Sequence, residues 1–341
     1  MKNNNLGFAI VGTGAIAGHH AACINRLDDC ELVAVCSSTQ ERAKIAGEKF
    51  GVPAYSDVKE MIKRPDIDVV CICTHSGNHL EPTMAAAKAG KHVICEKPLE
   101  ITLERADQMI QACRENHVKL ACIFQNRFSS DYLLLKEAVG QGRLGKLLLG
   151  NAYIKWFRDE EYYSSSPWKG TLQGDGGAAL INQGIHTIDL LLDVMGDVEN
   201  LSAKVRTVRH AIEGEDLAMA MLNFKNGALG AIQGSTALYP GYPERLEVFG
   251  DKGSVILEGG HIIAWNIAGE EPFIPKVQEE DSGASDPMAI STERHEQQFR
   301  DMVDAINQDR EPIVNGEEGR RSLALIRAIY ESSATGDTVK L

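Results

Sequence analysis

Near the start of the chain stands the sequence Phe8-Ala9-Ile10-Val11-Gly12-Thr13-Gly14-Ala15-Ile16-Ala17. It joins a short apolar run, typical of a buried strand, to the pattern G-x-G-x-x-A, and the residues up to Cys23 continue as a helix. In such a unit the first glycine makes the tight turn, the second lets the backbone approach a pyrophosphate, and the small third residue lets helix and strand pack closely. A turn that binds nothing is the alternative. We expect a dinucleotide site, with its phosphates at the helix N-terminus, formed by Gly12, Thr13, Gly14, Ala15 and Ile16.

The first 125 residues repeat this alternation of strand and helix. Helices are predicted over residues 39–50, 78–89 and 102–116. Short apolar runs separated by helices are typical of a parallel sheet covered on both faces. We therefore expect a doubly wound Rossmann domain over residues 1–127, with strands at Phe8–Val11, Leu32–Cys36, Val69–Thr74, His92–Cys95 and Leu120–Phe124.

The regular alternation of short strands and helices ends after residue 128. Helices are predicted over 132–139, 181–195, 293–307 and 317–333, a strand over 147–157, and an exposed acidic loop over 270–291. Residues 201–265 combine runs of high β-propensity with turn signals such as Asn226-Gly227, which indicates a largely antiparallel sheet. We expect a C-terminal α+β domain over 128–341 with a large, mainly antiparallel open sheet. A length of 341 residues fits two domains, with a cleft expected between them.

Composition limits the classes of partner. The chain has 35 Lys plus Arg against 48 Asp plus Glu, a net charge of -13, which argues against nucleic acid and anionic membranes as partners. No apolar run reaches the length of about 18 residues that a membrane span needs. The eight cysteines contain no C-x-x-C pair, so we expect reduced thiols in a cytoplasmic protein and no metal site. Small molecules and other protein chains remain as partners.

The second strand ends without a carboxylate, in Cys36-Ser37-Ser38-Thr39-Gln40. In NAD-binding domains an acidic residue about 20 positions after the glycines binds the ribose 2′-hydroxyl. Ser37 and Ser38 can instead donate hydrogen bonds to a 2′-phosphate. This pattern leaves NAD and NADP both open, and it favours NADP weakly.

Three further stretches carry a resemblance to a known family. They are Glu96-Lys97-Pro98 at the end of the fourth predicted strand; Gly176-Gly177-Ala178-Ala179-Leu180-Ile181-Asn182-Gln183-Gly184-Ile185-His186-Thr187-Ile188-Asp189; and Pro312-Ile313-Val314-Asn315-Gly316-Glu317-Glu318-Gly319-Arg320. They resemble three features of the Gfo/Idh/MocA oxidoreductases. These are the E-K-P motif, a second signature made of a double glycine followed by D-x-G-x-H-x-x-D, and the C-terminal region. The resemblance implies an NAD(P)-dependent enzyme acting on sugars, inositols or their derivatives, with Glu96 and Lys97 at the cofactor.

Two positions depart from the family's pattern. The second signature usually has an aspartate where this chain has Asn182, so a carboxylate that would share a proton with His186 is missing. The third predicted strand usually ends in T-P-x-x-x-H, and here His75 replaces the proline between Thr74 and His79. The resemblance still implies that Thr74 and His79 lie near the dinucleotide.

Oxidation of a secondary alcohol needs a hydride acceptor and a group that takes the hydroxyl proton. Lys97 lies just past a strand end, where ligands of doubly wound domains bind, and its ammonium can orient the alcohol. His186 is the candidate general base, since its ordinary pKa suits proton transfer at neutral pH. Asn182 and Asp189 stand four residues before and three after it, on one face of a predicted helix. A surface lysine and a satisfied core histidine are the alternatives.

The segment Tyr162-Tyr163-Ser164-Ser165-Ser166-Pro167-Trp168-Lys169 combines aromatic rings with hydroxyl groups, which suits a sugar. We expect Tyr163, Trp168, Lys169, Asp189 and Asn126 to contact the substrate. A structural turn is almost as good an interpretation of the aromatic segment, and an ion-paired hinge is the alternative for Asn126-Arg127. We do not assign a metal site to His75 and His79, a protease site to His295, or a catalytic site to His19-His20.

The sequence thus predicts an NAD(P)-dependent oxidoreductase that transfers hydride between nicotinamide and a secondary hydroxyl, with Lys97 assisting and His186 as base. A redox glycosidase that uses NAD without net redox change is one alternative, and a catalytically silent dinucleotide-sensing regulator is another. A homodimer or homotetramer formed through the C-terminal sheet is expected.

Overall fold

The computed structural model describes residues 5–271 and 292–341. The chain divides into two compact units, Met1–Gln125 with Ser291–Arg320, and Asn126–Ile290 with Arg321–Leu341. The first boundary falls close to the predicted one at residue 127. The segment 291–320, which the sequence placed in the second domain, belongs to the first unit. The loop predicted over 270–291 lies outside the described residues, apart from its first two.

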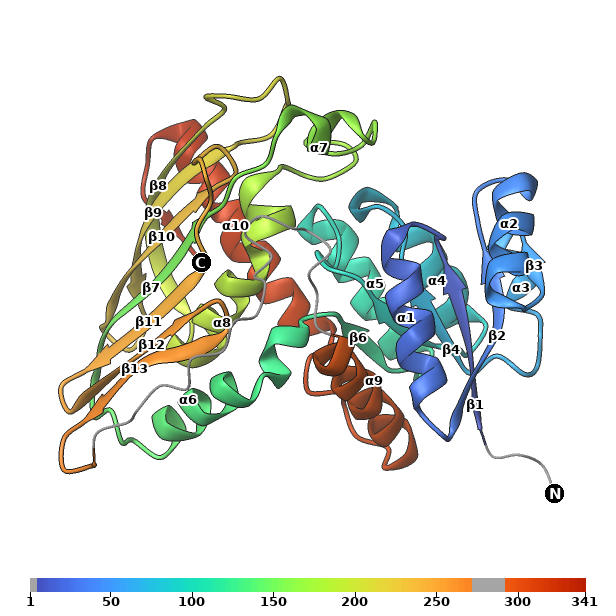
Figure 1. Ribbon diagram of the computed structural model, residues 1–341, viewed down its shortest axis with the longest axis horizontal. Coiled ribbons are helices and arrows are strands. Elements are labelled where there is room, and N and C mark those ends of the chain that lie inside the picture. Colours follow the sequence, from blue (N-terminus) through green and yellow to red (C-terminus); the bar gives the residue numbers. More distant parts are fainter. Residues whose placement is uncertain (1–4, 272–291) are drawn as a thin grey trace. The chain divides into compact units, whose positions relative to one another are not determined.

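The first unit contains a parallel six-stranded sheet in the order β3-β2-β1-β4-β5-β6 (Figure 1). All pairs are parallel, as the sequence predicted. The strands are β1 (Leu6–Val11), β2 (Cys30–Cys36), β3 (Ala54–Tyr55), β4 (Val69–Ile72), β5 (His92–Cys95) and β6 (Leu120–Cys122). The sequence did not predict β3, because two residues are too few to show a period.

Helices connect these strands at the predicted places. Thr39 and Thr102 cap α2 and α5 by accepting the backbone N–H of Arg42 and Arg105. Gly51 ends α2 in the left-handed conformation, at φ 71°. The helices are α1 (Ala15–Arg26), α2 (Gln40–Phe50), α3 (Val58–Met61), η1 (Ser76–Asn78), α4 (Leu80–Lys88), α5 (Leu103–Glu115) and α9 (Thr292–Asn307).

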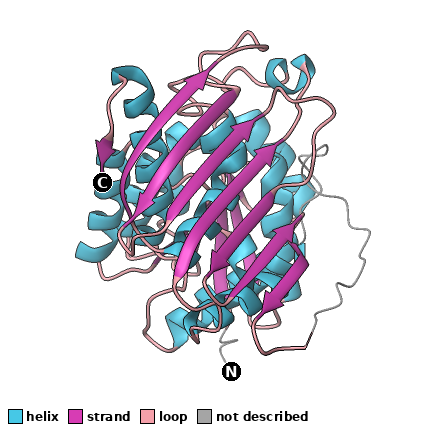
Figure 2. Ribbon diagram, turned by 90° about the vertical axis from the view of Figure 1, so that its left-hand side faces the viewer, coloured by secondary structure: helices cyan, strands magenta, loops and turns pink. Residues whose placement is uncertain are grey.

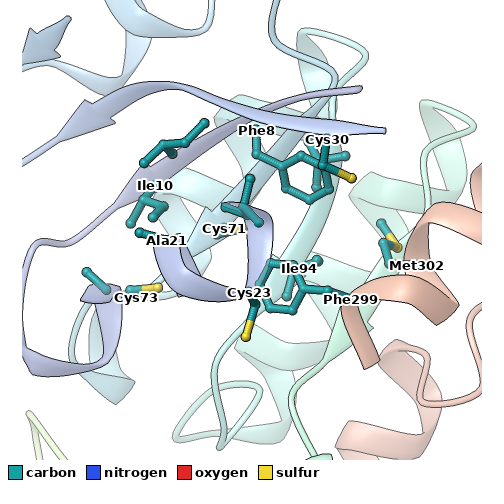
Figure 3. Close-up of a cluster of buried hydrophobic side chains, with 14 of the residues drawn as sticks. Phe8, Ile10, Ala21, Cys23, Cys30, Cys71, Cys73, Ile94, Phe299 and Met302 are labelled. Atoms are coloured by element: carbon teal, nitrogen blue, oxygen red, sulfur yellow. The ribbon is translucent and has the colours of Figure 1, made fainter. Parts of the chain in front are cut away.

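Helix α9 completes the core of this unit by packing against α1. Phe299 of α9 stacks on Phe8 of β1, with ring centroids 6.0 Å apart, and Met302 lies in the same cluster (Figure 3). Cys23 and Cys71 also belong to this cluster. All eight cysteines are buried and none forms a disulfide, and burial raises the pKa of Cys23 to about 12. The thiols therefore pack as small apolar groups.

The second unit contains an eight-stranded sheet in the order β13-β12-β11-β7-β10-β9-β8-β14 (Figure 2). Within this sheet the pair β7–β10 is parallel, and the other described pairs are antiparallel. This mixed but mainly antiparallel sheet confirms the prediction. Its strands are β7 (Leu147–Lys155), β8 (Val198–Arg206), β9 (Leu217–Phe224), β10 (Leu229–Ser235), β11 (Arg245–Gly250), β12 (Gly253–Glu258), β13 (His261–Ile267) and β14 (Val339–Lys340).

Helices cover one face of this sheet. α8 packs on β7 and β11, and α6 packs on β12 and β13. The other face carries exposed apolar side chains, because residues alternate along each strand: Met219 and Met221 of β9 are 57% and 60% exposed. The remaining helices along this part of the chain are η2 (Gln125–Phe128), α6 (Ser130–Gly140), α7 (Glu160–Ser164), η3 (Ala179–Gly184), α8 (Ile185–Met195) and α10 (Gly316–Thr335).

The single helix predicted over 181–195 is corrected by the structure. Residues Ala179–Gly184 form a π-helical turn, η3, and the regular helix α8 begins only at Ile185. Asn182 and His186 therefore lie on different helical forms, and simple α-helical spacing does not relate them. None of the described helices is long and apolar enough to cross a membrane.

Candidate functional site

The glycine-rich turn follows β1 and opens α1. Gly12 has φ 94°, and a Cβ there would lie 2.5 Å from the carbonyl carbon of Cys73. Gly14 faces open space, since a Cβ on it would meet nothing within 4 Å. The first turn of α1 has no acidic residue and no side-chain cap. Its N–H groups and the space beside Gly14 fit a pyrophosphate, as the sequence predicts.

Three neighbouring strands end at the same edge of the parallel sheet. Gly12 follows β1, Thr74 follows β4, and Lys97 follows β5. Thr74 donates its hydroxyl to the carbonyl of Asn78 at 2.9 Å, which shapes the turn after β4. Lys97 is half-buried. The structure therefore places the predicted catalytic lysine at the same edge as the predicted dinucleotide turn.

Glu96 connects α1 to the turn that carries Lys97. Its Oε1 lies 2.9 Å from Nε2 of His20, and its Oε2 accepts the backbone N–H of Lys97 at 3.2 Å. Burial alone would raise the pKa of Glu96, but the His20 hydrogen bond and the charges of His20, His295 and Lys97 lower it to about 2. Glu96 is thus an anion that holds the Lys97 backbone, and its predicted contact with the cofactor stays a prediction.

Helix α9 brings His295 beside this pair. Its ring centroid lies 6.5 Å from that of His20, and both side chains are buried. Neither histidine was predicted from the sequence as a site residue. His20 had a local signal, its position on the helix after the glycine turn, whereas nothing local links residue 295 to residue 20.

His79 holds the turn after β4 against the segment after β5. Its Nδ1 lies 3.0 Å from the carbonyl oxygen of Pro98, and its Nε2 lies 3.1 Å from that of Thr74. The side chain is buried, and this burial lowers the pKa of the imidazole. Both ring nitrogens contact backbone carbonyls, so His79 holds the two segments together, and its predicted place near the dinucleotide stays a prediction.

The two serines after β2 have different environments. Ser37 is buried, with its hydroxyl 2.9 Å from that of Thr13, whereas Ser38 is exposed. Only Ser38 is therefore placed to donate to a 2′-phosphate without breaking a contact within the protein. The weak preference for NADP has no support in this geometry.

In the second unit, Asn182 and His186 are both half-buried, on η3 and on the first turn of α8. The amide nitrogen of Asn182 donates to Oδ1 of Asp175 at 2.6 Å, and Asp175 is only 1% exposed. Asp175 thus supplies a carboxylate next to Asn182, the position where the signature usually has one. Sequence reasoning did not single out Asp175. The available signal was an acidic residue directly before the double glycine.

Glu215 fixes the start of η3. Its carboxylate accepts the backbone N–H groups of Ala178 and Leu180, at 3.2 and 2.7 Å, and the hydroxyl of Tyr330 at 3.0 Å. Burial raises its pKa to about 7, and these hydrogen bonds oppose the rise. Gly177 is needed here, because a Cβ would lie 2.3 Å from the Tyr330 hydroxyl. Sequence reasoning also missed Glu215.

Arg158 and Lys169 supply positive charge near this turn. Arg158 is buried and donates to Oε1 of Gln183, at 2.8 Å from Nη2. The Lys169 ammonium lies 4.0 Å from the centre of the Tyr162 ring and donates to Oγ of Ser165 at 3.0 Å. Burial lowers the pKa of Lys169, while the charge of Asp175 opposes this.

Two predicted substrate contacts lie in the interior. Asp189 is fully buried and makes two 2.7 Å hydrogen bonds with Arg127, which favours the ion-paired alternative for that arginine. Tyr163 is 7% exposed, and its hydroxyl lies 2.7 Å from that of Thr236. A substrate contact for either residue stays a prediction that this packing does not support.

The remaining predicted contacts, Asn126 and Trp168, are half-buried, on η2 and after α7. No group of three or more histidine, cysteine or acidic residues suited to a metal ion occurs within residues 5–271 and 292–341. His75 lies beside the Asn78 side chain, with 2.9 Å between Nε2 and Nδ2.

Family models match most of the chain. Residues 6–124 match the Gfo/Idh/MocA model described as an oxidoreductase family with an NAD-binding Rossmann fold. Residues 132–256 match the C-terminal domain model of the same family.

Individual proteins match along their whole length. The myo-inositol 2-dehydrogenase of Thermotoga maritima is 32% identical, with 97% of each chain covered. The D-glucoside 3-dehydrogenase of Escherichia coli is 28% identical over 100% of this chain and 99% of its own. The WlbA dehydrogenase of Bordetella pertussis, solved with NADH and UDP-GlcNAcA, is 31% identical, with a TM-score of 0.89 and 99% of each chain covered.

Proposed function

The chain belongs to the Gfo/Idh/MocA family of NAD-binding oxidoreductases, and on that premise we propose that it transfers hydride between nicotinamide and a secondary ring hydroxyl of a sugar, inositol or sugar derivative. One observation carries the proposal: Lys97 stands at the strand edge that also carries the glycine-rich turn, and the His20–Glu96 contact joins the two.

We assign three roles. Bound NAD supplies the hydride acceptor. The Lys97 ammonium orients the hydroxyl and stabilises the alkoxide as it forms, which a cation does most strongly where water is excluded. His186 takes the hydroxyl proton, and Asn182, which cannot take a proton, positions the groups around it.

NAD(H) is the cofactor we favour. Ser37 is engaged with Thr13, and the WlbA relative was solved with NADH. The candidate residues for the dinucleotide are those of the glycine-rich turn, with Ser38 at the ribose and Thr74 at the end of β4. Equal saturation by NADP in a titration followed by fluorescence of the reduced nicotinamide would reject this preference.

The test of the reaction uses a panel of inositols, aldoses, glycosides and UDP-linked sugars, including an acidic one, with NADH formation as the signal. We expect Lys97→Met and His186→Asn each to lower kcat/KM about 10²- to 10⁴-fold, the size expected of a lost proton-transfer or charge-stabilising group. Lys88→Met, on the exposed end of α4, is the control. Unchanged turnover in Lys97→Met would exclude this mechanism.

Two other outcomes have specific meanings. Cleavage of a glycoside without accumulation of NADH would identify a redox glycosidase. Tight dinucleotide binding with no turnover of any panel member would identify a sensing regulator.

We also propose that the open face of the eight-stranded sheet binds a second copy of this chain. Large apolar patches on a protein surface mark interaction sites. Strands about 4.8 Å apart and residues about 3.3 Å apart give this face an area on the order of 800 Å², the size of one side of a standard interface. Exposed side chains near its centre include Leu149, Met219, Met221 and Leu229.

A further inference from the structure

The polar side chains around Asn182 form one directed chain of hydrogen bonds. Arg158 donates to Oε1 of Gln183, Nε2 of Gln183 donates to Oδ1 of Asn182 at 2.8 Å, and Nδ2 of Asn182 donates to Asp175. Nε2 of Gln183 also lies 2.7 Å from the hydroxyl of Tyr162. The chain therefore joins a cation at one end to a carboxylate at the other.

The two charged ends determine how both amides point. A guanidinium only donates hydrogen bonds, so Gln183 must present its oxygen to Arg158. An ionised carboxylate only accepts, so Asn182 must present its nitrogen to Asp175. These two orientations leave the nitrogen of Gln183 facing the oxygen of Asn182, so the two amides form a hydrogen bond. If Asp175 lost its charge, this contact would no longer specify the orientation of Asn182.

Asp175 is itself fixed by the backbone. Its Oδ2 accepts the N–H of Gly170 at 3.0 Å, while its Oδ1 accepts Asn182. The side chain is 1% exposed, so water does not compete for these contacts. A buried carboxylate with two such donors is a rigid support for the half-buried Asn182.

We propose that Asp175 is a positioning residue for the reaction, holding the Asn182 amide in one orientation beside the start of the helix that carries His186. The family's signature usually carries a carboxylate at position 182. In this chain the carboxylate belongs to Asp175 and lies one hydrogen bond away from that position. This inference rests on the proposed function, because the reaction assigned to His186 gives the orientation of Asn182 its purpose.

The contact between positions 175 and 182 requires a carboxylate at one position and an amide at the other. Asn182→Asp alone would bring two carboxylates to the 2.6 Å contact, so one must take up a proton or move away. Asp175→Asn alone can satisfy Gly170 or Asn182 but not both, because its amide has only one oxygen. In Asp175→Asn/Asn182→Asp the amide oxygen at position 175 accepts Gly170, and the amide nitrogen there donates to the carboxylate at position 182. Each contact is then restored.

The experiment is a double-mutant cycle on the full-length enzyme with its best substrate. We expect each single variant to lower kcat about tenfold or more, with a smaller change in KM and in NADH affinity, and the double variant to regain most of kcat. A primary deuterium isotope effect on kcat should rise in the single variants, since misplacement slows the chemical step. Glu161→Gln, an exposed charge on α7, is the control.

Three results would overturn the proposal: single variants with unchanged kcat, a loss of kcat matched by an equal loss of NADH affinity, or a double variant no better than the worse single one. Urea unfolding of the same four proteins measures the coupling without substrate. If the wild-type enzyme turns over no panel member, the proposed function fails. Additive unfolding energies would then reject the 175–182 pairing separately.

Discussion

A methyl group on Gly12 and one on Gly14 would meet opposite surroundings. At Gly12 it would overlap the backbone of Cys73 and Thr74, and the φ of 94° is strained for any residue with a side chain. At Gly14 the backbone has an ordinary φ of -71°, and the added group would enter open space. The fold therefore requires a glycine at position 12, whereas Gly14 leaves the open space in which we propose that the pyrophosphate binds.

We predict that Gly12→Ala destabilises the protein by more than the strain of about 1–3 kcal/mol, because the overlap adds to it. Gly14→Ala should leave the free energy of unfolding within about 0.5 kcal/mol of wild type. It should nevertheless weaken NADH binding about tenfold or more, since the methyl group keeps the pyrophosphate from the N–H donors. Urea unfolding and NADH fluorescence titration measure both effects. Unchanged NADH affinity in Gly14→Ala would place the pyrophosphate elsewhere.

At the scale of single elements, the π-helical turn η3 is the unusual feature of the second unit. It begins where Glu215 binds two backbone N–H groups, and it ends where α8 begins with the His186 turn. The wider π turn is common at functional sites. Here it presents Asn182 to Asp175, while α8 places Asp189 in the interior with Arg127.

Glu215 gives this element a dependence on pH. Its pKa is raised from the usual 4.5 to about 7, so the folded state binds this proton more tightly than the unfolded state. The tighter binding of this proton stabilises the folded state fully below pH 4.5, and this stabilisation is lost as the pH rises through 7. We predict that stability falls between pH 5 and 8, on the order of 3 kcal/mol from this group.

Glu215→Gln removes the titration and keeps an acceptor for Leu180 and Tyr330. Its free energy of unfolding, measured in urea at several pH values, should lack this slope. Glu331→Gln, an exposed neighbour on α10, should keep it. Equal slopes in wild type and Glu215→Gln would show that burial does not raise the pKa of this carboxyl.

At the scale of the whole molecule, the eight-stranded sheet has one covered face and one open face. Ala218, Ala220 and Leu222 of β9 point to the helices and are buried, whereas Met219 and Met221 alternate with them and are exposed. Water contact on such apolar area is unfavourable, which supports self-association through this face.

We predict that Met219→Lys/Met221→Lys shifts the protein to monomers, because two buried ammonium groups per chain would face their symmetry mates. Sedimentation velocity over a range of concentrations gives the mass. Leu133→Lys/Leu134→Lys changes two exposed apolar residues on α6 and should leave the mass unchanged. A wild-type protein that sediments as a monomer at micromolar concentration would contradict the proposed interface.

The sequence by itself determined what is local in the chain. The strand, glycine turn and helix of residues 6–26 follow from apolar period, turn chemistry and helix propensity over adjacent residues, and the structure has them as predicted. The same holds for the capped helices after Thr39 and Thr102 and for the position of Lys97 at a strand end. The runs of high β-propensity and the turn signals over residues 201–265 predicted the mainly antiparallel second sheet for the same reason.

Only the tertiary structure decided which distant groups meet. His20 and Glu96 are 76 residues apart, and Phe299 reaches the core around Phe8 from the far end of the chain. Asp175 and Glu215 contact η3 and the residue before it because the fold brings the turn before η3 and the segment before β9 together. Burial, hydrogen bonding and pKa depend on neighbours in space, and no period along the chain encodes them. The chain of hydrogen bonds around Asn182 therefore depends on the tertiary structure.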